Sequence, residues 1–129
     1  MRVLGIEFAG SDMFYVVLDS ADGVKSIGSG SRLSLGETRS RTALMSFQSA
    51  VTTLFNETAP DRVAIKAKPE NGSMRAGAAA LKMEGIVLAN CRCDVDFVSG
   101  ARVNKAEAIP NNMYGYLQPA LRAAVASIE

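Results

Sequence analysis

The hydrophobic pattern at the start of the chain is typical of strands. An apolar run, Val3–Ile6, and a β-branched and aromatic run, Phe14–Leu18, flank the turn-forming segment Gly10–Asp12. This arrangement predicts two antiparallel strands joined by a tight turn. A second turn, Asp19–Gly23, leads into Val24–Gly30, whose glycines and serines favour a weak third strand at an edge or with a bulge.

The period of the pattern changes to that of a helix after Ser40. Apolar residues then recur every three or four positions, at Leu44, Phe47, Val51, Leu54 and Phe55. Thr38 or Ser40 can cap the start of this helix, and Pro60 enforces its end. We expect the apolar stripe to pack against the sheet.

A strand and a second helix follow. The segment Arg62–Lys68 reads as a short strand, and because a helix separates it from the earlier strands, we expect it to run parallel to one of them. Ser73 can cap a helix that runs to about Asn90. The expected packed face of that helix combines small and apolar residues, Gly77, Leu81, Gly85 and Leu88.

The last part of the chain predicts one more strand and one more helix. Asp94–Val98 alternates as a strand should, and Ser99–Asn112 is rich in turn formers and reads as a loop. A final helix is expected from Pro119, a favoured first-turn residue. The chain shows no internal repeat or linker, so it predicts a single α/β domain over residues 1–129, with five strands in the order β-β-β-α-β-α-β-α and helices on both faces of a mixed sheet.

Composition excludes several classes of function. Fourteen basic and thirteen acidic residues leave a net charge of +1, so any nucleic-acid surface must be local. There is no histidine, and the two cysteines, Cys91 and Cys93, lack the partners of a structural zinc site. We expect them to be reduced thiols. No signal peptide or membrane-spanning stretch is evident, which predicts a cytoplasmic protein without a membrane partner.

Three short stretches resemble the ribonuclease H-like fold, and within it the RuvC and YqgF group. The opening Val3–Ser11 is similar to that group's first strand, which normally reads Leu-Gly-Ile-Asp before a glycine-containing turn. Arg62–Lys66 resembles its fourth strand, and Ala78–Ala89 resembles the helix that follows. The chain is also similar to a small bacterial family of this fold. The resemblance covers roughly the first hundred residues, and its motifs are short.

The resemblance implies a site built from carboxylates. Nucleases of this group use converging acids to hold two magnesium ions about 4 Å apart. Glu7 takes the first acidic position, as a metal ligand if the protein is active, whereas Lys66 stands where the fourth strand has an acid. The start of the last helix, within Tyr114–Arg122, carries no acid. Other acids that an active site would have to recruit are Glu70, Glu84 and Glu107.

Lys66 permits a different interpretation of the same position. It can pair with Glu7 across adjacent parallel strands, placing an ion pair where the group has a metal. Positive charge is also concentrated locally, since residues 62–105 hold eight basic and four acidic residues. The candidate nucleic-acid-binding residues are Lys66, Lys68, Arg75 and Lys82. The alternative is a solvated face of mixed charge, and the few aromatic residues give no indication of base stacking.

Three functions stay open at this level. The first is a RuvC-like protein that associates with structured DNA or RNA through a degenerate or unusual nuclease site. The second is an active, magnesium-dependent nuclease with substituted carboxylates. The third is a non-catalytic scaffold or homodimer, for which Met113–Tyr116 would suit an interface. A nucleotide-cleft ATPase of the actin and sugar-kinase type is disfavoured, because it needs two such domains.

Overall fold

Five strands form one mixed sheet at the centre of the protein. The computed structural model describes residues 1–129, with strands β1 (Arg2–Ala9), β2 (Asp12–Ala21), β3 (Val24–Ser34), β4 (Arg62–Lys66) and β5 (Asp94–Val98). Their order across the sheet is β3-β2-β1-β4-β5. The pairs β3–β2 and β2–β1 are antiparallel, while β1–β4 and β4–β5 are parallel. The predicted fold class and the parallel fourth strand are confirmed.

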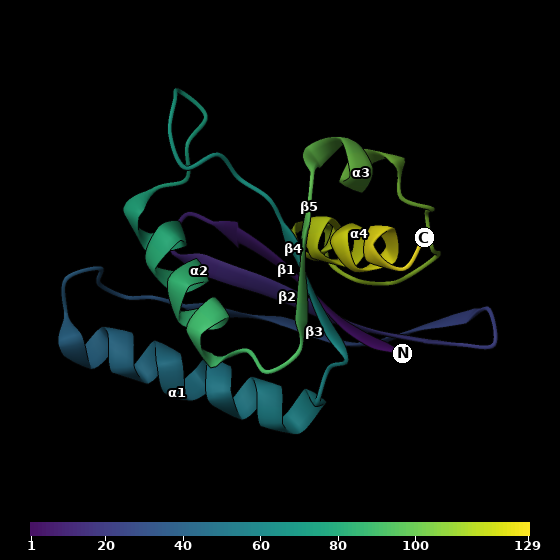
Figure 1. Ribbon diagram of the computed structural model, residues 1–129, viewed down its shortest axis with the longest axis horizontal. Coiled ribbons are helices and arrows are strands. Elements are labelled where there is room, and N and C mark those ends of the chain that lie inside the picture. Colours follow the sequence, from purple (N-terminus) through teal and green to yellow (C-terminus); the bar gives the residue numbers. More distant parts are fainter.

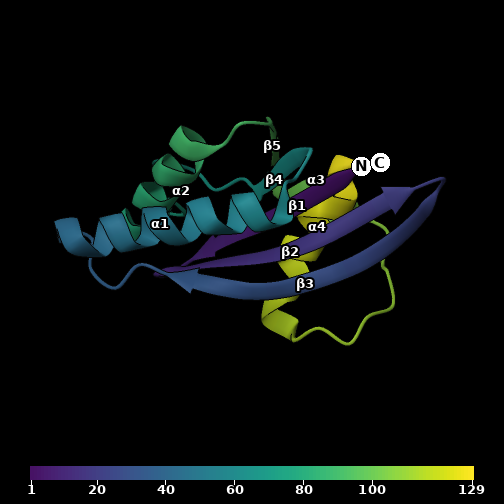
Figure 2. The same cartoon turned by 90° about the horizontal axis from the view of Figure 1, so that it is seen from below.

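Helices cover both faces of this sheet. The long helices α1 (Arg41–Thr58) and α2 (Ala78–Asn90) lie on one face, and α4 (Gln118–Ser127) lies on the other with the short α3 (Gly100–Lys105) beside it (Figures 1 and 2). A single 3-10 turn, Gly115–Leu117, leads into α4. None of these helices combines the length and apolarity that crossing a bilayer would take.

The central strand β1 contributes to both halves of the core. Leu4, Ile6 and Phe8 are buried on the side of α1 and α2. Val3 is buried on the side of α4. Successive side chains of a strand point to opposite faces. Glu7, two pleats beyond Val3, therefore points to the α4 side.

Helix α4 sits very close to the sheet because β1 carries a glycine beneath it. A Cβ atom on Gly5 would lie 2.1 Å from the carbonyl oxygen of Ala120 and 2.9 Å from Cβ of Ala124. The helix crosses the strands obliquely: Leu117 packs near Gly30 of β3, and the carbonyl oxygen of Ser127 accepts a hydrogen bond from Arg62 of β4. The start of α4 therefore lies over β2 and β3, and its end over β4.

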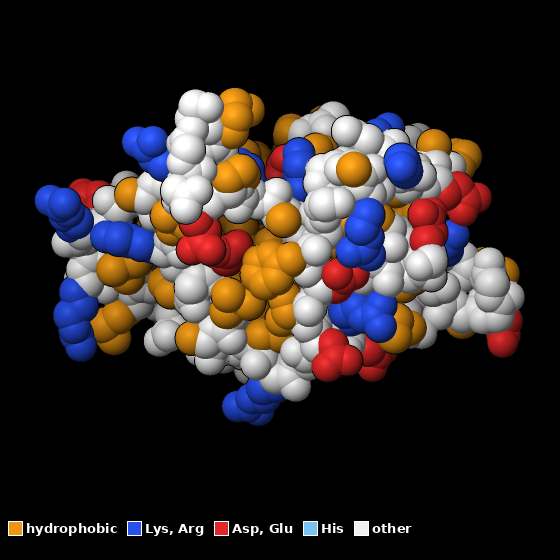
Figure 3. Space-filling view, turned by 45° about the horizontal axis from the view of Figure 1, so that its top comes forward, with side chains coloured by type: hydrophobic (Ala, Val, Ile, Leu, Met, Phe, Trp, Pro, Cys, Tyr) orange, Lys and Arg blue, Asp and Glu red, His pale blue; other side chains and the backbone are white.

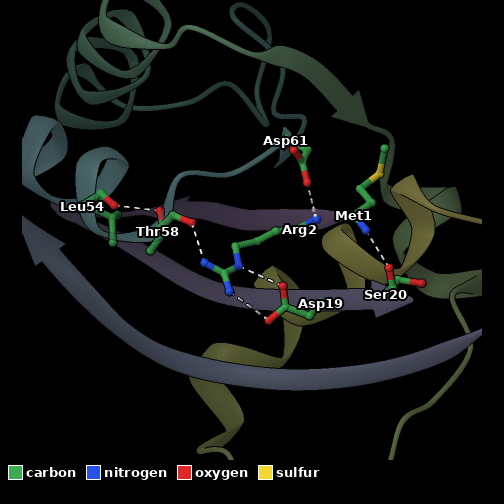
Figure 4. Close-up of polar contacts among 7 residues, drawn as sticks. All are labelled: Met1, Arg2, Asp19, Ser20, Leu54, Thr58 and Asp61. Atoms are coloured by element: carbon green, nitrogen blue, oxygen red, sulfur yellow. Dashed lines mark hydrogen bonds and ion pairs between the residues drawn. The ribbon is translucent and has the colours of Figure 1, made fainter. Parts of the chain in front are cut away.

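Arg2 ties three elements together at the opposite end of β1 from Glu7. Its Nε donates to Asp19 of β2 at 2.8 Å, and its Nη1 donates at 2.8 Å to the carbonyl oxygen of Thr58, at the end of α1 (Figure 4). Its backbone N–H donates to the Asp61 carboxylate at 2.7 Å. A cation at a helix C-terminus is favourable, because unpaired carbonyls gather there. This junction fixes where α1 ends and where β4 begins.

Two sequence predictions about helices are corrected. The second helix begins at Ala78, because Gly72 adopts a left-handed φ of 86° and Ser73 lies in the turn that follows rather than at a helix cap. Its buried residues are Ala80, Met83 and Val87. Apolar residues occur all around this helix, so the sequence does not specify one stripe.

The third correction concerns the segment after β5. The expected loop Ser99–Asn112 begins with the helix α3, capped by Ser99, whose Oγ accepts from the Arg102 N–H at 3.2 Å. Val103 is buried and anchors it against the α4 side of the core. A helix of six residues shows too few turns to be recognised by periodicity.

Candidate functional site

Glu7 and Lys66 meet where β1 and β4 end side by side. Ile6 pairs with Ile65 in the parallel register, which places the next residues, Glu7 and Lys66, together on the α4 side. The Lys66 Nζ lies 3.2 Å from Glu7 Oε2. The Glu7 side chain is 12% exposed and that of Lys66 29%. The predicted pairing of these two residues is therefore present.

The ion pair belongs to a row of side chains that crosses four strands. Phe14 of β2 is the cross-strand partner of Glu7, and Arg32 of β3 is the partner of Phe14. Directly opposed side chains lie close together on one face of a sheet. The guanidinium of Arg32 lies 3.8 Å from Oδ2 of Asp12. Both cations of the row thus have a carboxylate beside them.

Two tyrosines extend this row toward solvent. The Tyr116 ring packs on Phe14 with a centroid distance of 5.3 Å and an interplanar angle of 45°. Tyr114 stacks on Tyr116 at 5.4 Å and 11°. Phe14 is buried, whereas Tyr116 is 50% exposed and Tyr114 71% exposed. The three rings form an aromatic ladder from the core to the surface.

Hydrogen bonds hold the segment that carries the tyrosines. The Gln118 Nε2 donates to Asn111 Oδ1 at 2.7 Å and to the Met113 carbonyl at 3.2 Å. The Met113 N–H donates to Asn111 Oδ1 at 3.0 Å. Because Gln118 is the first residue of α4, this network fixes the preceding segment to the helix start.

The candidate acid Glu84 lies on the opposite face of the sheet from Glu7. Glu84 of α2 shares a small depression with Lys66 and Lys68, beside Phe8 and Ala80. Burial raises the pKa of the Glu84 carboxyl, and the negative charge of Glu70 raises it further. Glu84 therefore lies near Lys66 on the α2 side of the sheet, whereas Glu7 points to the α4 side.

Glu107 lies elsewhere. Its Oε2 accepts from Lys25 Nζ at 2.7 Å, at the end of the β2–β3 hairpin remote from Phe14. The hydrogen bond with Lys25 lowers the pKa of Glu107. The loop after α3 carries it there.

The candidate basic residues lie in different local surroundings. Lys66 and Lys68 line the same depression, whereas Lys82 donates to the Thr38 carbonyl and lines a groove between α1 and α2 with Arg39 and Arg41. Arg75 donates to the Gly72 carbonyl within its own loop. Figure 3 shows basic and acidic side chains interspersed over one face, with basic ones also at the left edge, near the start of α1.

The residues present do not fit the two-metal site that the sequence resemblance implies. No three aspartate, glutamate or cysteine side chains come close enough together to hold one metal ion. The carboxylate in the first position, Glu7, is instead paired with an ammonium group. A dication there would be repelled by Lys66 and would find too few negative ligands.

Comparisons with known proteins place the chain in a family and the fold in a class. Residues 1–124 match the family described as "Protein of unknown function (DUF3010)". The chain belongs to this family. No curated protein matches the chain by sequence.

Solved structures identify the fold that this family member adopts. RuvC of Thermus thermophilus matches with a TM-score of 0.77 at 14% identity, over 98% of this chain and 92% of that one. T. thermophilus RuvC in complex with a Holliday junction substrate matches with a TM-score of 0.75 at 17% identity, over 98% and 91%. The yeast mitochondrial Holliday junction resolvase Ydc2 matches with a TM-score of 0.54 at 14% identity, over 76% and 50%. The ribonuclease H-like, RuvC-like fold is confirmed.

Two members of the site, Arg32 and Phe14, escaped the sequence analysis, and Tyr116 was noticed only as part of a candidate protein interface. Arg32 joins the row only through the β2–β3 register, which contains an irregularity between Val16 and Leu18. Phe14 looked like an ordinary strand residue. The turn before α4 brings Tyr116 onto Phe14. The signal in the sequence was the close spacing of two tyrosines, Tyr114-Gly-Tyr116, whose rings stack on each other.

Proposed function

We propose that this family member is a nucleic-acid-binding protein on a RuvC-like fold, in which the Glu7–Lys66 ion pair occupies the position of a metal site. The observation that carries the proposal is the 3.2 Å separation of Lys66 Nζ and Glu7 Oε2. The pair gives this end of the sheet a fixed ammonium group, only partly exposed. Such a group interacts with a phosphate oxygen without any metal ion.

Charge arithmetic supports binding without hydrolysis. Two-metal hydrolysis needs several carboxylates to offset the charge of the cations. Replacing an acid by Lys66 removes one negative charge and adds a positive one, so it opposes a dication twice over. The same substitution improves the attraction for a phosphodiester.

The proposed ligand class is DNA or RNA. The fold neighbours include a RuvC solved with a Holliday junction substrate and a fowlpox virus resolvase solved with substrate Holliday junction DNA, the latter at a TM-score of 0.52. These are properties of those proteins and only suggest where to begin for this one. Four-way junctions, duplexes and single strands of DNA and RNA are therefore the first ligands to compare.

A binding and cleavage assay tests the proposal. Wild-type protein should bind labelled nucleic acid in EDTA with unchanged affinity on adding magnesium, and should leave it uncut. Lys66→Ala should weaken binding severalfold, whereas Lys105→Ala, at an exposed position on α3, serves as the matched control. Absence of binding to every ligand, or equal binding by Lys66→Ala, would contradict the proposal.

The alternative of a magnesium-dependent nuclease has one observation in its favour. Glu84 lies in the same depression as Lys66, and the negative charge of Glu70 contributes to its raised pKa. Magnesium-dependent cleavage abolished by Glu7→Gln and by Glu84→Gln would establish this alternative.

The homodimer that the sequence analysis left open is a separate question. Sedimentation of the ligand-free protein tests it.

A further inference from the structure

We propose that Tyr114 and Tyr116 form a stacking platform for an unpaired nucleobase, so that the protein prefers single-stranded nucleic acid to double helix. The inference rests on the proposed nucleic-acid binding and names the form of ligand and the residues that select it. It also revises the expectation, from composition alone, that base stacking is not indicated.

The platform is an aromatic ladder that reaches from core to solvent. Phe14 is buried in the sheet, Tyr116 packs on it at 5.3 Å, and Tyr114 stacks on Tyr116 at 5.4 Å with planes only 11° apart. Tyr114 ends the ladder and is 71% exposed. A fourth ring stacked on Tyr114 continues the same spacing, and every nucleobase has the flat face that this requires.

The rings are held in place before any ligand arrives. The Asn111–Gln118 hydrogen bonds fix the segment at the start of α4, and the Leu117 N–H donates to the Tyr114 carbonyl at 3.0 Å. Met113 is pressed against Gly30, where a Cβ would lie 2.6 Å from the Met113 methyl. A preordered platform loses little conformational entropy when a base binds.

The balance of charge makes stacking the larger contribution. Lys66 has Glu7 at 3.2 Å and Arg32 has Asp12 at 3.8 Å, so neither cation is free of an acid. Phosphate attraction at this face is therefore modest. Stacking on an aromatic residue contributes roughly 5- to 150-fold in affinity per base and does not depend on the charge.

The geometry also explains the preference for single strands. The flat faces of bases in a duplex are covered by their neighbours, so a ring on a protein surface reaches them only by unstacking a pair, which costs free energy. An unpaired nucleotide offers its face directly. Arg32, on the strand next to Phe14, is mostly exposed and lies on the same face, where it can meet the phosphate of that nucleotide.

The test compares a short oligothymidylate with a duplex of the same length by fluorescence anisotropy. Wild type should bind the single strand more tightly. Tyr114→Ala should lose roughly 5- to 150-fold affinity for the single strand, with an unchanged salt slope and unchanged duplex binding. Tyr114→Phe, which keeps the aromatic ring, should bind the single strand as tightly as wild type. In wild type, a stacked base should also quench tyrosine fluorescence, which can be measured because the chain has three tyrosines and no tryptophan.

The possible outcomes separate this inference from the function on which it rests. If wild type binds the single strand and the duplex alike, or Tyr114→Ala binds as wild type, the platform is wrong while nucleic-acid binding stands. If wild type binds neither ligand, both fail. If Tyr114→Ala abolishes self-association in sedimentation and leaves oligonucleotide binding unchanged, the rings belong to a protein interface and the inference is overturned.

Discussion

The ammonium of Lys66 lies 3.2 Å from Oε2 of Glu7, at the paired ends of β4 and β1. Two strands distant in sequence thus bring opposite charges together at the centre of the sheet, only partly in contact with water. Charges in such a position interact more strongly than on an open surface. We therefore expect the pair to affect both ion binding and stability at this end of the molecule.

The pair predicts how the protein responds to divalent ions. Calorimetry on wild type should detect no magnesium or manganese binding in the millimolar range. Lys66→Asp places a second carboxylate beside Glu7 and should produce a site with a dissociation constant on the order of a millimolar. The combined variant Glu7→Gln, Lys66→Asp should lose it again. Clear ion binding by wild type, lost in Glu7→Gln, would overturn the assignment of an ion pair.

The same pair predicts coupled effects on stability. Lys66→Met leaves the Glu7 carboxylate, 12% exposed, without its partner and should lower the free energy of unfolding by about 1–3 kcal/mol. Adding Glu7→Gln should recover part of that loss, because the uncompensated charge is removed. Urea unfolding of both single variants and the double variant measures the coupling. Strict additivity would show that the two residues do not interact.

The contact of α4 with Gly5 predicts a large effect from one methyl group. Gly5→Ala places a Cβ against the backbone of Ala120, which cannot move without shifting the helix, and should cost at least about 1–3 kcal/mol. Gly36→Ala is the matched control, since its Cβ would meet nothing within 4 Å. Thermal unfolding of both variants is sufficient. Equal stability of Gly5→Ala and wild type would mean that α4 sits farther from the sheet.

The raised pKa of Glu84 predicts that the free energy of unfolding falls as the pH rises. Burial first, and then the charge of Glu70, raise its pKa in the folded protein. The folded state therefore binds the proton more tightly than the unfolded state, and stability falls as pH rises from about 4.5 through the folded pKa. Glu84→Gln should stabilise the protein at pH 7 and flatten this dependence. Glu37→Gln, at an exposed loop position, should do neither.

The parts of the site that local pattern determines were predictable from sequence. The helix between β3 and β4 implied a parallel β4, and parallel pairing of two apolar strands brought Lys66 to Glu7. The neighbours supplied by long-range register were not predictable. The position of Arg32 beside Phe14 depends on the bulge in the β2–β3 pairing. Glu107 lies in a loop, whose path cannot be predicted from hydrophobic periodicity, and the structure places it beside Lys25.

The buried face of a helix could be predicted from the sequence for α1 but not for α2. The stripe of α1 was readable because its polar and apolar residues separate, and Phe47, Val51 and Leu54 are indeed buried. In α2 apolar residues lie all around the axis, so burial of Met83 rather than Leu88 is decided by the sheet and not by the helix.

The oblique passage of α4 across the strands has a consequence for how the chain is made. Val3, Val16 and Leu18 bury their side chains against residues 117–126, about a hundred positions later. At a synthesis rate of about 5–20 residues per second, the ribosome needs roughly 5–20 seconds to reach those residues, and until then that face of the strands is exposed to solvent. We therefore expect the apolar face of β1 and β2 to be open to a chaperone or to a second nascent chain until α4 has been synthesised and packs on it.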